Sequence, residues 1–150
     1  MGASIEIYNF ICDSLSKSGL NVEKQDICSY SPLTLAYIGD AVYELVIRSM
    51  ILTDGNAPVN KLHKRSSGLV KAETQAKIIK IFLDEELLSE DELRIYKRGR
   101  NAQSYTKAKN ATMVDYRMAT GFEALMGYLY LLGKSDRMME LIGIGISKTI

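Results

Sequence analysis

Two carboxylates lie in apolar stretches of the sequence, where an acid needs a partner. Asp40 lies within YIGDAVY and Glu123 within TGFEALM. An ionised carboxylate removed from water is costly unless a cation or hydrogen-bond donors compensate it, and a structural ion pair with Lys or Arg explains either acid taken alone. Two carboxylates close together must instead share a proton or a cation. Among cations bound by oxygen ligands, Mg²⁺ is the usual one near phosphates.

Small residues around both acids favour such a close approach. Gly39 is adjacent to Asp40, while Gly121 and Gly127 flank Glu123. A glycine inside a helix costs about 1 kcal/mol relative to alanine, so a compensating gain is expected. The neighbouring alanines are equally small: Ala36, Ala41, Ala119 and Ala124. We therefore expect the two helices that carry the acids to pack closely and to bring the acids together.

The elements that must position these acids are helices, and the sequence predicts an all-α bundle of about seven. Apolar residues recur at helical spacing, and no segment reads as a strand. The expected helices cover 4–18, 31–52, a short segment from 58, 69–83, a segment from 89, 112–132 and a segment from 135. Start signals at 31–32 and 89–92 and a stop signal at Gly133 support these boundaries. A length of 150 residues fits one domain, 1–150.

Charge is segregated along a chain whose net charge is only +1. Residues 84–92 hold six acids and no base, and residues 94–109 hold six bases and no acid. A second basic cluster, 61–65, surrounds the only histidine, His63. A run of charge is usually a solvated face, so these segments alone are weak evidence for nucleic-acid binding.

Several function classes find no support in the sequence. The N-terminus lacks the features of a signal peptide, and no apolar run is long enough to span a bilayer, so a cytoplasmic location is expected. Cys12 and Cys28 have no metal-ligand spacing and are expected to be reduced thiols in or near the core. The glycine-rich stretches 127–135 and 143–145 fit no phosphate-binding loop, so no nucleotide cofactor is expected.

Three stretches of this sequence resemble the catalytic domain of the ribonuclease III family. LAYIGDAVYEL (35–45) resembles the signature helix, ATGFEALMGYLYL (119–131) resembles the second acidic helix, and KRGRNA (97–102) lies between them in the matching order. The likeness covers nearly the whole chain beyond about residue 28. Because the chain ends soon after this region, without a separate double-stranded-RNA-binding domain, it looks like the bacterial, intracellular Mini-ribonuclease III branch.

The resemblance implies a magnesium-dependent endonuclease that hydrolyses phosphodiester bonds in double-stranded RNA. Asp40 and Glu123 fall on two of the family's metal ligands and are therefore the expected catalytic residues. Two further acids of the larger members fall on Ala36 and Thr120 here, as in the Mini branch, so a second stable metal ion is less expected. Similarity to that branch also implies a homodimer that matures a large (23S) ribosomal RNA precursor.

The resemblance also gives the basic segments a role, as walls of a valley that accepts the RNA duplex. Phosphate contacts give affinity and register without reading sequence, as expected for shape recognition of A-form RNA. The residues expected to contact RNA are Lys64, Arg65, Lys97, Arg98, Arg100, Asn101, Lys107 and Lys109. His63 is expected to face solvent or RNA, because catalysis by a metal requires no histidine as general base.

Two alternatives remain open from the sequence. Glu44 lies one turn from Asp40, so it either supports the metal site or pairs with Arg48. The whole chain is alternatively a non-catalytic RNA-binding or ribosome-associated protein with a ribonuclease III-like fold. The presence of both Asp40 and Glu123 favours the enzyme, since a purely structural descendant has no reason to keep two acids among apolar residues.

Overall fold

The computed structural model describes residues 6–102 and 112–150, and within these residues it forms helices and no strand. The helices are α1 (Ile7–Lys17), α2 (Pro32–Leu52), α3 (Val59–Val70), α4 (Ala72–Asp84), α5 (Glu90–Asn101), α6 (Met113–Leu131) and α7 (Ser135–Thr149), with a 3-10 turn, η1 (Ile27–Ser29), before α2. The all-α fold that the sequence predicts is therefore confirmed.

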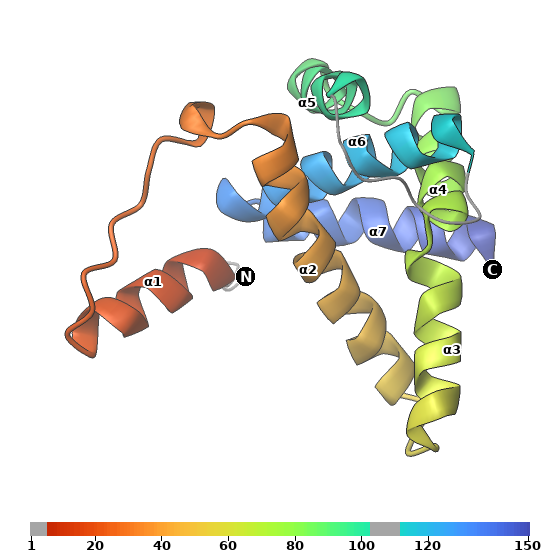
Figure 1. Ribbon diagram of the computed structural model, residues 1–150, viewed down its shortest axis with the longest axis horizontal. Coiled ribbons are helices and arrows are strands. Elements are labelled where there is room, and N and C mark those ends of the chain that lie inside the picture. The colour runs from red at the N-terminus through yellow and green to blue at the C-terminus, as the bar shows by residue number, and fades with distance from the viewer. Residues whose placement is uncertain (1–5, 103–111) are drawn as a thin grey trace.

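Helix α6 is the centre of the bundle. Helices α2, α4, α5 and α7 all pack against it, and α1 touches it near its C-terminal end (Figure 1). Because neighbours surround it, α6 is apolar on nearly every face, as expected for a buried helix. Helix α1 stands apart at the end of an extended linker, and its Tyr8 ring lies 5.5 Å from that of Tyr130.

Most helix boundaries follow from capping residues seen in the sequence. The Ser31 hydroxyl accepts a hydrogen bond from the Thr34 amide, and a complete capping box of Ser89 and Glu92 starts α5. Gly133 ends α6 with φ of +74°, a left-handed conformation that glycine adopts without strain.

Two expectations about local structure are wrong. The fourth helix begins at Ala72 and not at 69, because Lys71 is extended (φ −66°, ψ 156°) and separates α3 from α4. Cys28 is exposed, so only Cys12 of the two thiols belongs to the interior.

The core lies where α2, α4, α6 and α7 meet. Tyr43 packs edge-to-face on Phe122, with 5.0 Å between ring centroids, and its hydroxyl donates to the Leu69 carbonyl at 2.8 Å. This buried side chain therefore ties α2 both to α6 and to the end of α3. Among residues 6–102 and 112–150, no helix is both long and apolar enough to cross a membrane.

Candidate active site

The site begins where α2 and α6 cross with their backbones in contact. A Cβ atom on Gly39 would lie 1.8 Å from the Glu123 carbonyl oxygen, and one on Gly127 would lie 1.9 Å from the Leu35 carbonyl oxygen. No side chain fits at either distance, so the two glycines are what allows this crossing. The close packing that the sequence predicts for these two helices is present at Gly39 and Gly127.

Gly121 serves a different contact from the one expected. A Cβ atom there would lie 2.6 Å from two ring carbons of Tyr96, and one on Gly99 would lie 2.8 Å from the Cβ of Ala124. The absence of a side chain at Gly121 therefore allows α5, and not α2, to pack closely against α6. Small residues on two faces of α6 hold it between α2 and α5, which fixes the direction in which Glu123 points.

The crossing places the Asp40 and Glu123 carboxyl groups next to each other. Burial, which has the largest effect, hydrogen bonding to Asp40 and repulsion from the charge of Asp40 together raise the pKa of Glu123 from 4.5 to about 9. Asp40 itself is exposed to solvent, so the expectation that both acids are buried among apolar residues is wrong for Asp40 and holds only for Glu123. In the metal-free protein the Glu123 carboxyl is therefore protonated at neutral pH, and a cation is what would allow both groups to ionise.

Gln75 of α4 completes this arrangement, and the sequence analysis missed it. Gln75 is 2% exposed. Hydrogen bonding from Gln75 lowers the pKa of Glu123, whereas burial and Asp40 raise it. A signal was present: Gln75 occupies an inward position of the apolar pattern formed by Ala72, Ala76 and Ile79. A polar residue at such a position needs a hydrogen-bond partner, and here the partner is a carboxyl group.

The residues at the two missing acid positions offer no additional carboxylate. Ala36 is buried, and the Thr120 hydroxyl donates to the Tyr116 carbonyl within its own helix at 3.0 Å. Glu44 pairs with Arg48 at 3.1 Å on the partly exposed face of α2, which matches the ion-pair alternative. Within the described chain, no third His, Cys, Asp or Glu joins the two acids as a cluster able to hold a metal.

The residues expected to contact RNA lie on two separate surfaces. Lys97, Arg98 and Asn101 line an open groove between the exposed side of α5 and Pro32 at the start of α2. Arg100 lies over the Tyr96 ring, 5.6 Å from its centroid. On α3, Lys64 and Arg65 line another groove, where Arg65 pairs with Asp54. Lys107 and Lys109 fall outside the described residues.

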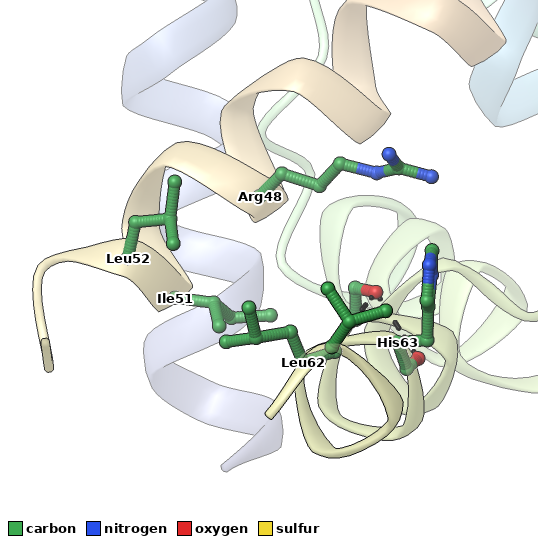
Figure 2. Close-up of a pocket in the computed structure, with 7 residues that line it drawn as sticks. Arg48, Ile51, Leu52, Leu62 and His63 are labelled. Carbon is green, nitrogen blue, oxygen red and sulfur yellow. Dashed lines mark hydrogen bonds between the residues drawn. The ribbon is translucent and has the colours of Figure 1, made fainter. Parts of the chain in front are cut away.

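His63 lies in a small apolar pocket between α2 and α3. The pocket has a volume of about 200 Å³, and Figure 2 shows Ile51, Leu52 and Leu62 forming its apolar wall, with Arg48 and His63 reaching toward its rim. Neither Asp40 nor Glu123 lines it. This position agrees with the expectation that His63 is not the catalytic base.

The chemistry of the pair fits a hard divalent cation. Both candidate ligands are carboxylates, and oxygen ligands are those that Mg²⁺ prefers, whereas Zn²⁺ sites are usually built from His and Cys. Asp40 also lies close enough to Glu123 to raise the pKa of Glu123, and a shared cation relieves such repulsion. With only two carboxylates, water and phosphate oxygens would complete the coordination.

Comparisons with known proteins agree with this geometry. A model of the Ribonuclease III domain matches residues 33–134, which include both acids. The Mini-ribonuclease 3 of Clostridium tetani is 48% identical over 86% of this chain and 85% of its own length, and that of Thermoanaerobacter sp. is 49% identical over 82% and 85%. A crystal structure from Fusobacterium nucleatum, 35% identical, superimposes with a TM-score of 0.74 over 83% of this chain and 99% of that one. The chain therefore belongs to the ribonuclease III family of endoribonucleases, in the Mini-ribonuclease 3 branch.

Proposed function

We propose that this protein is a magnesium-dependent endoribonuclease that hydrolyses phosphodiester bonds in double-stranded RNA. The observation that carries the proposal is the contact of the Asp40 and Glu123 carboxyl groups at the crossing of α2 and α6, where burial and mutual repulsion raise the pKa of Glu123 to about 9. A buried carboxyl with so strongly raised a pKa, next to a second acid, has no evident structural purpose, since no ion pair of the described residues involves either Asp40 or Glu123.

The two acids have different tasks in this reaction. Asp40 is exposed and meets the substrate side of the site, while Glu123 is held deeper and must release its proton before it can bind a cation. A Mg²⁺ ion held by both would activate a water molecule and stabilise the charge that develops on the phosphate. The glycine contacts at Gly39 and Gly127 keep the backbones of α2 and α6 close together beside the two acids. No protein nucleophile is required.

The acting form is proposed to be a homodimer. Leu33, Tyr37 and Leu45 lie on one face of α2 and are 38%, 79% and 62% exposed. A row of exposed apolar side chains on one helix is typical of a surface that another protein covers. A second copy of the chain placed there would bring two sites to one surface, so that each strand of an RNA duplex meets one pair of acids.

The basic surfaces are proposed to hold the phosphates of that duplex. The α5 surface carries Lys97, Arg98, Arg100 and Asn101, and the α3 surface carries Lys64 and Arg65. As the family resemblance of the sequence implies, the natural substrate is proposed to be a precursor of 23S ribosomal RNA, and the place of action is proposed to be the cytoplasm.

A cleavage assay tests the proposal. The purified protein is incubated with a long RNA duplex, the same RNA as single strands and a DNA duplex, each with Mg²⁺ or with EDTA. We expect cleavage of the RNA duplex in Mg²⁺ alone, and its loss in Asp40→Asn and Glu123→Gln. Asp13→Asn, the same change on the distant α1, serves as control and should be fully active. Absent or EDTA-resistant cleavage by the wild type, or full activity of either site variant, would refute the proposal.

A further inference from the structure

We propose that the groove between α4 and the N-terminal end of α6 is a third phosphate-binding surface, at which Lys71, Lys77 and Lys80 contact the backbone of the RNA duplex. The inference deepens the proposed function and rests on it, because it adds a surface for the same substrate. These lysines form no basic run in the sequence, since other residues of α4 separate them. The fold is what places them along one groove.

The groove lies where α4 packs beside α6 (Figure 1). It has a volume of about 460 Å³, and Lys71, Lys77 and Lys80 line it opposite Asp115 and Met118 of α6. All three lysines are exposed. Lys77 and Lys80 are three residues apart, so they lie on the same face of α4.

The three lysines have no acidic partner in the part of the chain that the structure describes, since none of its ion pairs involves them. Two acids, Glu73 and Asp115, also line the groove. Each lies in the first turn of its helix, where the positive end of the helix dipole stabilises a carboxylate. The lysine ammonium groups are therefore available to bind phosphates.

Charge of this kind suits a substrate that is recognised by shape. Contacts from lysine to phosphate give affinity and register on a duplex without reading its sequence. The net charge of the whole chain is only +1, so a groove lined by three unpaired lysines does not follow from a general excess of positive charge. The chemistry that fits this groove is a row of phosphates.

The groove also lies within reach of the proposed metal site. Asp115 of the groove and Glu123 of the site are eight residues apart on α6, which on a helix is about 12 Å along the axis and about 80° around it. One turn of a nucleic-acid duplex is longer, roughly 34 Å in DNA. A duplex that lies at Glu123 can therefore place neighbouring phosphates along the groove.

Binding of an RNA duplex without cleavage tests this surface. The variant Lys77→Gln with Lys80→Gln is compared with Lys17→Gln with Lys134→Gln, which removes two exposed lysines on α1 and beyond the C-terminal end of α6. Affinity for a fluorescent RNA duplex is measured in EDTA at several salt concentrations.

We expect the α4 double variant to bind about 10-fold or more weakly at low salt, with a slope of log affinity against log salt that is less steep by about 2, one for each lost phosphate contact. The control should change affinity less than about twofold, because charges far from the RNA are screened. Cleavage in Mg²⁺ by the α4 variant should show a raised KM with an unchanged kcat.

The outcomes separate this inference from the function on which it rests. Equal affinity and equal salt dependence of the two double variants overturn the role of the groove and leave the metal site standing. Weaker binding by the α4 variant, together with a wild type that does not cleave, supports the groove and refutes the enzyme. A wild type that binds no RNA duplex overturns both.

Lysine acetylation of the wild type gives a second measurement if the α4 variant does not fold. Mass spectrometry follows the labelling of each lysine with and without the RNA duplex. Stronger protection of Lys77 and Lys80 than of Lys17 and Lys134 supports the proposal, and equal protection overturns it.

Discussion

Glu123 shows how the position of one side chain sets its chemistry. Its pKa rises from 4.5 to about 9, first because the carboxyl group is buried and then because of Asp40. Between these two values the folded, metal-free protein holds a proton that the unfolded chain has released. The folded state thus binds more protons, so the free energy of unfolding falls as the pH rises from about 4.5 to about 9.

Replacing Glu123 by Gln should remove this pH dependence. In EDTA at pH 9, we expect Glu123→Gln to be more stable than the wild type by about 1–3 kcal/mol, the usual cost of a buried polar group left uncompensated. At pH 5 the difference should be much smaller, because the folded protein keeps this carboxyl neutral and the pH is only just above the ordinary pKa of 4.5 at which the unfolded chain releases the proton. Urea unfolding at pH 5, 7 and 9 measures the difference, with Asp13→Asn as reference. A parallel decline in Glu123→Gln would show that another group is responsible.

At the scale of single residues, the sequence shows which residues are unusual but not which side chains they contact in the fold. Asp40 and Glu123 could be predicted because each is an acid in apolar company, and their family motifs agree. Gln75 could not be connected to them, because its contact with Glu123 depends on how α4 is placed against α6. Polar residues occur on most helices, and only the packing makes this one buried.

The crossing of α2 and α6 is the element contact on which the site depends. A methyl group on Gly39 would collide with backbone atoms of Glu123 and Gly127, which cannot yield as a flexible side chain can. We expect Gly39→Ala to destabilise the protein by at least about 2 kcal/mol, as overpacking does, and to separate the two acids. Thermal unfolding and Mn²⁺ titration measure the two effects.

Gly143→Ala on α7 is the matched control for this substitution. A Cβ atom at Gly143 would meet nothing within 4 Å, so the change should stabilise α7 by up to about 1 kcal/mol. Equal effects of the two substitutions would contradict the account of the helix crossing.

A second contact between elements joins α5 to α7. The Arg137 guanidinium donates to both Glu92 oxygens at 2.9 Å and to the Leu87 carbonyl at 2.7 Å, and Glu92 is 6% exposed. Hydrogen bonds from Arg137 and from Ser89 outweigh burial and lower the pKa of Glu92. The stability that this contact contributes is therefore present above the ordinary carboxyl pKa of 4.5 and is lost as the pH falls below it.

Arg137→Met should cost about 2–4 kcal/mol at pH 7, because it leaves Glu92 buried without its partner. At pH 3 the difference from the wild type should be smaller, since the carboxyl group is then protonated. Arg94→Met removes the exposed pair of Arg94 with Asp91 and should cost at most about 1 kcal/mol. Chemical denaturation at both pH values checks this, and an equal cost for the two variants would contradict the importance of the buried pair.

At the scale of elements, the sequence predicts well where most helices begin and end, but it predicts poorly which helices pack against each other. Ser31, Ser89 and Gly133 mark boundaries because capping is a local interaction between residues close in sequence. The break between α3 and α4 falls at Lys71, and no glycine or proline stands at that position to predict it. Gly121 was assigned to the wrong partner helix because the sequence does not specify which helix approaches which face of α6.

At the scale of the whole molecule, the proposed dimer makes a simple prediction. Tyr37→Lys and Leu45→Lys each place a charge in the exposed apolar row of α2, which a second copy is proposed to cover. Light scattering after gel filtration should give about twice the 16.8 kDa mass for the wild type and the monomer mass for both variants. Met139→Lys, on the exposed side of α7, should remain dimeric. A monomeric wild type, or unchanged dimers of both α2 variants, would contradict the proposed interface.

The overall all-α architecture could be predicted from apolar spacing and family motifs, but the arrangement of charge could not. The basic residues form runs in the sequence, whereas the fold distributes them between a surface on α5 and another on α3. Their relation to the two acids depends on packing between distant segments, and in the proposed dimer it depends also on a second chain.

The most direct test of the central claim is the rate of RNA-duplex cleavage in Mg²⁺ by wild type, Asp40→Asn, Glu123→Gln and the double variant. If both acids hold one cation, removing either should cost more than about a hundredfold, beyond the loss seen for residues that only support metal ligands. The double variant should then be no slower than the slower single variant, because residues that act as a unit are not additive. Single variants with near wild-type rates, or losses that multiply in the double variant, would contradict a shared metal site at Asp40 and Glu123.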